Sequence, residues 1–493
     1  MSDPLALLPL AIAAGGGRIG AHGSDRADDF EAQQLVAAGL TLLQRSAPLV
    51  RALSGKRSAL LLPTSPAFLT ALAASDGRGA VLINPLAAPA EIAFQCHDAN
   101  VGALFTISSF VPRLPPHLPA VLLDESPRSA RVLVDGRSYD VDLGAHHGLS
   151  IEGERDVDGR DEEAVIVYTS AMRGTPLGAV LTHRNLLANA RATIEAMEIV
   201  STDHVFAILP YAHLFGLTVT GSAPLIAGAR VTTMERFNPV KAVEQLASGV
   251  TVITGVPAVY RAMLTAIERR DVRFEDTVLR LCVCGGAVLP IELQHRWADA
   301  TGIELREGYG LTEAGPVCLF NRPSAPNTRG TLGVQFPGVD VAIFPPADYE
   351  RNVAPNVEVE PLPDGETGEI CVRGSNVSPG YLHAAHGLPR RGEWLYTGDE
   401  GVRDDEGRVT FLGLLKPMFT RNGFNVYPRE IERVVGAMPG VTKVVCTAIP
   451  DPAKENDILL RVNGDVSEAD VKRWCEQRLS VYKQPSVVEV LGR

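Results

Sequence analysis

The sequence predicts an α/β protein with largely parallel sheets, and two observations carry this prediction. Short apolar runs recur along the chain up to Gly286, and segments with helical periodicity separate them. Strands that alternate with helices are typical of layered α/β folds with parallel sheets. From residue 321 onward Pro and Gly punctuate short strand patterns, which predicts a smaller β-rich unit. A compact α+β segment follows Gly413.

The elements can be justified in order from the N-terminal end. Residues 28–54 have a helical pattern, and residues 58–85 have the pattern of a strand, a turn, a helix and a strand. Further apolar runs are short enough to be buried strands: 164–170, 205–210, 230–234, 250–257 and 279–286. Helical patterns cover residues 185–197 and 257–270.

Length and charge restrict the possible functions. The chain has 493 residues, of which 45% are apolar and 21% charged, which is ordinary for a globular protein of two to four units. The net charge of −12 argues against nucleic acid or an anionic membrane surface as the main partner. Both of these partners require concentrated basic charge.

The N-terminal segment and the cysteines do not indicate secretion. The apolar start of the chain lacks a basic n-region and is too short to span a bilayer, so we expect no targeting signal and no membrane span. Seven scattered cysteines include no CxxC pair and no Cys/His spacing typical of a metal site. We therefore expect reduced, buried thiols in a cytoplasmic protein.

The first candidate motif is YTSAMRGTPLGAVLTH, residues 168–183, which has the outline of a phosphate-binding loop between a strand and a helix. Thr169 and Ser170, together with Gly174 and Gly178, can present hydroxyl and backbone N–H groups to phosphate oxygens. The spacing is not GxxxxGK[ST], and an ordinary turn explains the stretch equally well.

The second motif is GYGLTEAGP, residues 308–316. Gly308 and Gly310 would allow the backbone to approach a ligand closely. Thr312 offers a hydroxyl group, and Glu313 offers a hard oxygen ligand suited to Mg²⁺. A tight turn that carries a solvated glutamate is the structural alternative.

Two further motifs lie in the C-terminal part of the chain. Asp399 in LYTGDEGVRDDEGRVTFLG (395–413) could accept hydrogen bonds from ribose hydroxyls, although a hairpin with surface acids explains it too. GFNVYPREIE (423–432) predicts a strand and then a helix that Pro428 opens, with acids in its first turn. Its alternative is purely structural.

One short match is rejected. GGGRIG, residues 15–20, fits the pattern GxGxxG of dinucleotide-binding folds. The run before it contains prolines, and no helical pattern starts at once after it. A lone match without strand and helix around it is weak.

Taken together and in order, the four motifs resemble those of AMP-forming adenylating enzymes. This superfamily contains acyl- and aryl-CoA synthetases, luciferases and peptide-synthetase adenylation domains. LPYAHLFGLT (209–218), GVPAVYRAML (255–264), CGGAVLP (284–290) and GEICVRGSNVSPGYL (368–382) extend the resemblance over nearly the whole chain, and fatty acyl-CoA synthetases are the most similar branch.

The resemblance implies a domain organisation. It implies a large N-terminal domain of stacked α/β subdomains over residues 1–412, with the β-rich subdomain at about 321–412. A hinge would follow at 413–417, and a small, mobile and shortened α+β domain would occupy 418–493.

The resemblance also implies chemistry. Members of the superfamily activate a carboxylic acid with ATP and Mg²⁺ to an acyl-adenylate, and pass the acyl group to a thiol, usually that of coenzyme A. The implied site residues are Thr169, Ser170 and Gly174 in the phosphate loop, Gly285, Gly286 and Ala287 along the adenine and acyl pocket, Tyr309 and Gly310 at adenine, Thr312 at phosphate, Glu313 on Mg²⁺, Asp399 on ribose and His213 near the acyl carboxylate.

The chain departs from the family pattern at three places. The loop lacks two threonines and a lysine, whose position is Leu177, and Arg173 offers a cation elsewhere in the loop. In the hinge, Leu414 stands at the position of a ribose-binding arginine, and Pro417 stands at the pivot, where its fixed φ would restrict rotation. The family's C-terminal Pro-x-x-x-x-Gly-Lys motif has no counterpart, and Lys483 is not expected to replace its lysine.

We therefore expect an acid–thiol ligase for an aliphatic carboxylic acid, with weak ATP binding and impaired adenylation. One lost charged donor costs on the order of 10²–10³ in rate. The alternative is a non-adenylating homologue that binds an acyl-CoA or another acyl thioester and transfers its acyl group, or a pseudoenzyme that acts through an acyl-carrier or other partner protein. Tight acyl-CoA binding without ATP binding would favour the alternative.

Overall fold

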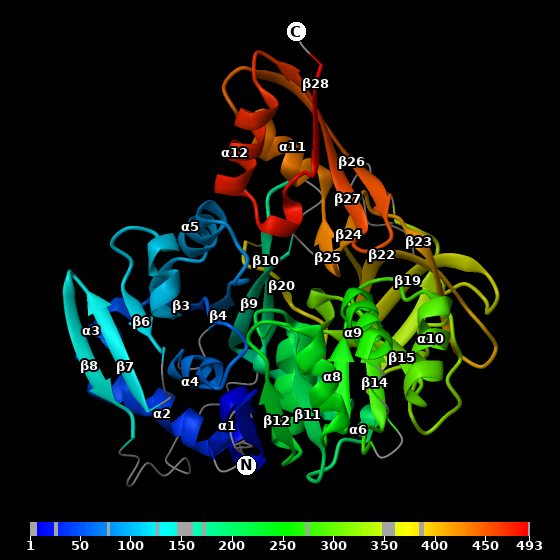
Figure 1. Cartoon of the computed structure of the whole chain (residues 1–493), viewed down its shortest axis with the longest axis horizontal. Helices are drawn as coiled ribbons and strands as arrows, with labels where there is room; N and C mark the ends of the chain where they lie inside the picture. The colour runs from blue at the N-terminus through cyan, green and yellow to red at the C-terminus, as the bar shows by residue number, and fades with distance from the viewer. Residues whose placement is uncertain are drawn as a thin grey trace.

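The computed structural model of the chain is an α/β structure in which two large sheets lie beneath a smaller C-terminal unit (Figure 1). It describes residues 7–23, 28–75, 79–124, 128–144, 161–169, 174–270, 272, 274, 277–347, 360–383 and 389–491.

The first large sheet is parallel at its centre. Its strands follow the order β17 (Val334–Gln335), β16 (Val317–Phe320), β15 (Leu305–Gly310), β14 (Leu281–Cys284), β13 (Val252–Gly255), β11 (His204–Ala207), β12 (Arg230–Thr233), β1 (Arg18–Ala21) and β2 (Phe30–Glu31). Strands β15 to β1 in this order run parallel, and antiparallel strands close both edges.

The second large sheet has the same design. Its strands follow the order β20 (Gly380–Tyr381), β10 (Leu177–Thr182), β9 (Glu163–Thr169), β4 (Ala80–Leu82), β3 (Arg57–Leu60), β5 (Val101–Thr106), β6 (Ala120–Leu122), β7 (Ser129–Val134) and β8 (Arg137–Asp142). Strands β9, β4, β3, β5 and β6 run parallel. The predicted α/β class with parallel sheets is therefore confirmed.

Helices cover the sheets and connect their strands. They are α1 (Leu8–Ala14), α2 (Ala32–Arg45), α3 (Ala47–Leu53), α4 (Ala67–Ala74), α5 (Pro89–Asp98), α6 (His183–Met197), α7 (Ala223–Ile226), α8 (Pro239–Ala247), α9 (Pro257–Arg270) and α10 (Ile291–Thr301), with a π-helical segment at Phe215–Ser222 and 3₁₀ turns at Ser108–Arg113 and Thr312–Ala314. Helices begin and end close to the residues predicted for 185–197 and 257–270.

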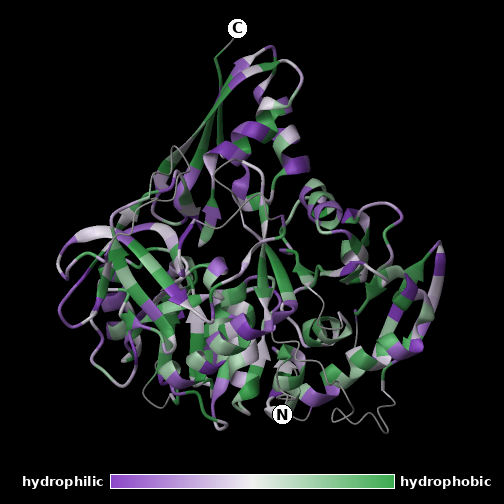
Figure 2. Cartoon of the chain, turned by 180° about the vertical axis from the view of Figure 1, so that it is seen from behind, coloured by the Kyte–Doolittle hydropathy of each residue, from purple (hydrophilic) through white to green (hydrophobic). Residues whose placement is uncertain are grey.

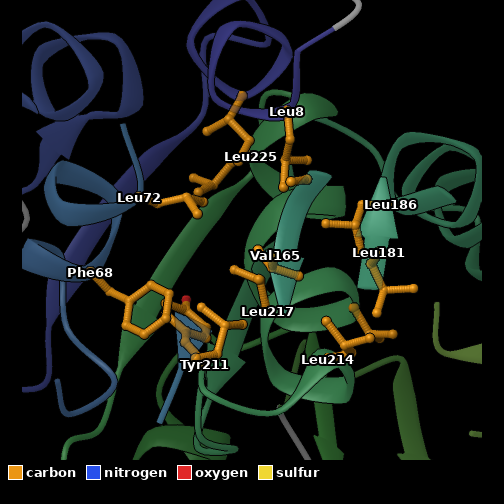
Figure 3. Packing of buried hydrophobic residues seen from close by; sticks show 14 of the residues in the cluster. Leu8, Phe68, Leu72, Val165, Leu181, Leu186, Tyr211, Leu214, Leu217 and Leu225 are labelled. Carbon is orange, nitrogen blue, oxygen red and sulfur yellow. The ribbon is translucent and has the colours of Figure 1, made fainter. Parts of the chain in front are cut away.

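The main hydrophobic core joins the two sheets. Leu72 of α4, Val165 of β9 and Leu217 and Leu225 of the π-helical region and α7 belong to one buried cluster. Figure 3 shows these side chains together with Leu8, which comes from the first helix of the chain. In Figure 2 hydrophobic colours run along the strands of the interior.

The β-rich and C-terminal parts complete the fold. A third sheet contains β18 (Val339–Phe344), β19 (Thr367–Gly374), β21 (Arg390–Arg391), β22 (Trp394–Arg403) and β23 (Val409–Leu414). A hairpin of β24 (Phe419–Arg421) and β25 (Phe424–Val426) precedes α11 (Pro428–Gly436), and β26 (Val441–Asp451), β27 (Glu455–Gly464) and β28 (Val487–Val490) form a sheet with α12 (Glu468–Arg478). Pro428 opens α11, as predicted.

One predicted feature of the first motif is wrong. A strand, not a helix, follows the loop: β10 pairs with β9 as an antiparallel hairpin, and α6 begins only at His183. The β-branched and apolar residues of LGAVLT favour the strand. Thr182 then caps α6 reciprocally with Asn185, because each side chain accepts a hydrogen bond from the backbone N–H of the other.

Three smaller expectations from the sequence can be compared with the structure. GGGRIG joins α1 to β1, so the order is helix then strand and the rejection of a dinucleotide motif is confirmed. All seven cysteines are free and buried. No helix in the described ranges is long and apolar enough to cross a membrane.

Candidate functional site

A cavity of about 1140 Å³ lies where the two large sheets, the third sheet and the C-terminal unit meet. Its wall is formed by the ends of β9, β14 and β15, by the hairpin β22–β23 and by residues of β25, α11 and α12. The predicted site residues in its wall are Thr169, His213, Gly285, Gly286, Ala287, Tyr309, Gly310, Thr312, Glu313 and Asp399.

The remaining predicted residues belong to the first motif. Ser170 and Arg173 lie outside the described residues. Gly174 borders the cavity without lining it, whereas its neighbours Thr175, Pro176 and Leu177 do line it. Leu177 therefore places an apolar side chain at the wall where the family pattern has a cation.

Glu313 is held by two hydroxyl groups. It lies in the 3₁₀ turn after β15, and its Oε1 accepts hydrogen bonds from Thr169 at 3.1 Å and from Tyr381 at 2.9 Å. Burial and the nearby Glu313 charge raise the pKa of Tyr381, so that this hydroxyl keeps its proton. The turn thus presents an ordered carboxylate to the cavity.

The donor set around Glu313 fits Mg²⁺ that is shared with a phosphate ligand. Mg²⁺ is commonly bound through one or two carboxylates together with substrate phosphates and waters. No group of three or more His, Cys, Asp or Glu side chains among the described residues could hold a metal by itself. A single carboxylate with a neighbouring hydroxyl therefore suits a metal that arrives with a nucleotide.

Asp399 lies in β22 opposite Leu414 of β23. The Tyr309 hydroxyl donates to Asp399 Oδ2 at 2.6 Å. Burial raises the pKa of Asp399, while the Lys416 charge and the Tyr309 hydrogen bond act in the other direction. The side chain of Lys416 lies against Gly398 and donates to the Thr397 carbonyl, so a cation stands beside Asp399 although Leu414 supplies none.

The wall next to Asp399 contains the segment Gly285–Ala287. The backbone of Gly285 lies close to the Gly308 carbonyl and the Phe215 ring, because a Cβ at Gly285 would be 2.8 Å from the former and 3.2 Å from the latter. Tyr309 lines the same region. Gly285 is packed against these two groups, so the space for a ligand lies on its cavity side, between the Gly285 backbone and the Tyr309 ring, and this space is called the slot below. Backbone on one side and an aromatic ring on the other suit a flat heteroaromatic group.

His213 faces the cavity from the segment before the π-helix. Its side chain is accessible from the cavity, and the protein around it lowers its pKa by desolvation. Phe215 N donates to its Nδ1 at 3.3 Å. The imidazole is therefore neutral near pH 7, with Nδ1 as an acceptor and Nε2 carrying the proton.

Several residues of the cavity were missed by the sequence analysis. Glu307 directly precedes the GYG motif, and burial raises its pKa to about 8. Tyr381 is the second-last residue of the motif 368–382, so its place in a motif could have marked it as a candidate site residue. Lys416 lies between the two positions at which residues 413–417 depart from the family pattern, Leu414 and Pro417, and its closeness to Asp399 is visible only in the fold. Arg433 of α11 had no signal, since only the docking of the C-terminal unit brings it here.

Comparison with known proteins identifies the family. The model of the AMP-binding enzyme family matches residues 49–382, which is more than half of the chain, and the chain belongs to this family. The resemblance inferred from the motifs is thereby confirmed.

Individual relatives and solved structures agree with this assignment. A long-chain-fatty-acid–CoA ligase of Bacillus subtilis (strain 168) is 26% identical over 475 residues, covering 88% of this chain and 82% of the relative. A feruloyl-CoA synthase of Amycolatopsis sp is 30% identical over 451 residues, covering 89% and 85%. A malonyl-CoA ligase in a ternary product complex with methylmalonyl-CoA and AMP is 26% identical with a TM-score of 0.77, covering 99% of this chain and 98% of that chain.

Proposed function

We propose that the protein is an acid–thiol ligase that joins an aliphatic carboxylic acid to coenzyme A at the expense of ATP. The observation that carries this proposal is the meeting of Glu313, Asp399 and Tyr309 with the slot at Gly285 in one cavity. The names of the relatives, which are CoA ligases and a CoA synthase, point to the same reaction class.

The proposed reaction has two steps. In the first, a carboxylate oxygen of the acid attacks the α-phosphorus of ATP, forming the acyl-adenylate and releasing pyrophosphate. In the second, the thiol sulfur of coenzyme A attacks the acyl carbon, forming the thioester and releasing AMP. Each step needs charge stabilisation at the phosphate or the carbonyl oxygen.

Each residue has a defined task in this proposal. Adenine occupies the slot between Tyr309 and Gly285, and the ribose hydroxyls donate to Asp399. Thr312 donates a hydroxyl hydrogen bond to phosphate, and Thr169 does the same once its hydroxyl leaves Glu313. Glu313 would hold Mg²⁺, which would supply positive charge to the phosphate when bound. His213, with its neutral imidazole, faces the acid carboxylate.

The apolar part of the cavity supports an aliphatic substrate. Its wall includes apolar side chains from both large sheets and from α6: Leu82, Val167, Met197, Val283, Val317, Phe320 and Leu332. Apolar linings bind acyl chains through the area that they remove from water. The cytoplasm, where thiols stay reduced, is the proposed location, in line with the seven free cysteines.

The proposal includes a mobile C-terminal unit. We propose that residues 418–493 turn about the hinge 413–417, so that one cavity serves both steps. The thiol of coenzyme A is the proposed acceptor, and the thiol of an acyl-carrier protein is the alternative acceptor.

A second candidate function rests on Leu177 and Leu414. Both line the cavity at positions where the family pattern has cations. A protein with this wall would bind ATP weakly and could instead accept a ready-made acyl thioester and transfer its acyl group. Impaired adenylation therefore belongs to the proposal.

Acid-dependent ATP–pyrophosphate exchange with Mg²⁺ tests the first step. The acids would be short to long aliphatic acids with ferulic acid as the aromatic comparison, and Glu313→Ala would be the control. We expect slow exchange with an aliphatic acid that the Glu313→Ala variant loses. Absence of exchange with every acid, in folded protein that binds acyl-CoA, would favour the second candidate.

ATP affinity supplies an independent test. Because Leu177 provides no charge, we expect Leu177→Lys to tighten calorimetric ATP-Mg²⁺ binding about tenfold, as a partly buried charge-assisted contact does. If Leu177→Lys binds ATP-Mg²⁺ no more tightly than the wild type does, the missing cation does not limit ATP binding.

A further inference from the structure

Helix α11 of the C-terminal unit reaches across to the loop of the first motif. Arg433 Nε donates to the Gly174 carbonyl at 2.7 Å. The Arg429 carbonyl lies so close that a Cβ on Gly174 would be 2.8 Å from its oxygen. Residues more than 250 positions apart in the sequence therefore form one wall of the cavity, and the guanidinium group of Arg433 lines it.

The other cations in the wall are engaged elsewhere. Lys483 donates to Glu91 at 2.9 Å and to Glu430 at 2.7 Å. Lys416 donates to the Thr397 carbonyl and stands beside a carboxylate, as described above.

Arg478 is held within its own helix. Its guanidinium lies 3.5 Å from the ring centroid of Trp474, and its Nη1 donates to the Gln477 side chain at 3.0 Å. Arg433 is less fully paired than these three cations. In the described part of the chain it makes one hydrogen bond, from its Nε to the Gly174 carbonyl. Among the described residues none accepts a hydrogen bond from its two Nη groups, which can donate to a ligand in the cavity.

Charged side chains of both signs line the wall of the cavity. Its carboxylates are Glu91, Glu307, Glu313, Asp399 and Glu430, against the cations Lys416, Arg433, Arg478 and Lys483. Lys483 is consumed by two of the carboxylates. Burial keeps Glu307 protonated at neutral pH. Leu177 carries no charge, and Arg433 is the cation that contacts the loop 174–177, through the Gly174 carbonyl.

We infer that Arg433 binds a phosphate group of the adenine nucleotide beside the loop 174–177. The C-terminal unit thereby supplies from α11 the positive charge that Leu177 does not. This inference rests on the proposed function, because it presupposes that the cavity takes an adenine nucleotide. Two Nη groups in a fixed fork match two oxygens of one phosphate.

A phosphate bound by Arg433 would also fix the position of the C-terminal unit. A nucleotide phosphate that touches both the loop and Arg433 contacts α11 and β10 at once, and so stabilises the arrangement in Figure 1. Phosphate binding and docking of the unit are then coupled by the free energy of that contact.

Calorimetric titration with AMP and, separately, with adenosine tests the inference. AMP carries the phosphate and adenosine does not, so their ratio of affinities isolates the phosphate contact. The variants are Arg433→Ala, Arg433→Lys and the double variant Arg433→Ala with Leu177→Lys. Arg473→Ala is the matched control, because Arg473 is exposed, pairs with Asp470 and changes the net charge equally.

We expect Arg433→Ala to weaken AMP binding about tenfold and to leave adenosine binding unchanged. Arg433→Lys and the double variant should recover part of the AMP affinity, and Arg473→Ala should match the wild type. If Arg433→Ala weakens both ligands equally, the residue is structural and the inference is overturned. If AMP and adenosine bind the wild type equally, the phosphate contact is absent while the nucleotide slot stands. If neither binds, the proposed function fails as well.

Discussion

Glu307 shows how one position in the cavity wall responds to burial. It lies in β15 with 7% of its surface exposed, and burial raises its pKa from an ordinary 4.5 to about 8. The backbone N–H of Leu289 is a hydrogen-bond donor to the carboxyl and opposes this effect. At neutral pH the folded protein thus holds a proton that the unfolded chain releases.

The sign of the resulting pH dependence follows from linkage. A raised carboxyl pKa means that the folded state binds more protons between about pH 4.5 and 8, so stability falls as pH rises through this window. We expect Glu307→Gln to lie within about 1 kcal/mol of the wild type at pH 5 and to exceed its free energy of unfolding by about 4 kcal/mol at pH 8.5.

Urea unfolding at the two pH values measures this difference. Glu366→Gln, at an exposed position, is the control and should show no such pH dependence. Equal stability of Glu307→Gln and wild type at pH 8.5 would show that the carboxyl ionises without cost in the folded protein.

At the scale of the element, β15 and the following turn place Glu313. Gly310 ends the strand, and a Cβ there would lie 1.8 Å from the Pro316 carbonyl oxygen. A Cβ on Gly308 would meet its nearest atom, in the Phe320 ring, at 3.5 Å, which is ordinary contact. The two glycines of GYG therefore differ in what they tolerate.

We expect Gly310→Ala to destabilise the protein by at least about 2 kcal/mol, because a backbone segment must move to admit the methyl group. It should also abolish pyrophosphate exchange by displacing Glu313. Gly308→Ala should fold with near wild-type stability. Thermal unfolding of the two variants gives the comparison, and a Gly310→Ala protein as stable as Gly308→Ala would contradict the packing argument.

At the scale of the whole molecule, a buried charge cluster joins the C-terminal unit to α5. Lys483 is 5% exposed and bridges Glu91 of α5 and Glu430 of α11. Glu91 also accepts from Ala88 N at the start of α5 and from the Ser480 hydroxyl. Lys483, which the sequence analysis set aside as a catalytic lysine, is thus part of the interface.

Lys483→Met would leave two buried carboxylates without their cation. We expect a loss of about 3 kcal/mol in stability, because removing one partner of a buried ion pair leaves the other partner's charge desolvated and uncompensated. Lys472→Met, which removes an exposed pair with Glu468, should change stability by less than about 0.5 kcal/mol. Melting midpoints would be recorded together with proteolysis in the hinge 413–417. Unchanged cleavage there would show that the cluster does not hold the unit in place.

Pro417 lies in the proposed hinge 413–417. Its ring fixes φ near −65°, so we expect the C-terminal unit to adopt fewer orientations than it would with another residue at this position. Small-angle scattering of wild type and Pro417→Asp, with and without ligand, measures this. We expect a wider distribution of sizes for the variant. A wild type that already shows two widely different forms would contradict the expectation.

The sequence alone determines the fold class, most strands and helices, and several of the residues that line the cavity. Apolar runs and helical periodicity are local signals, and four ordered motifs are specific enough to identify the family. It also exposes the missing cations at Leu177 and Leu414. The strand β10 was missed because its short apolar run also fits the start of a helix, and only its pairing with β9 distinguishes the two.

Only the tertiary structure decides which charged side chains meet. Arg433 directly follows the motif 423–432 and Lys483 ends the turn Val481–Lys483, but their sequence positions do not reveal their partners, which the docking of the C-terminal unit provides. Burial likewise sets the pKa of Glu307, which is a property of the surrounding protein and not of the residue. Electrostatic roles depend on distances between segments far apart in the chain, and local sequence patterns do not contain those distances.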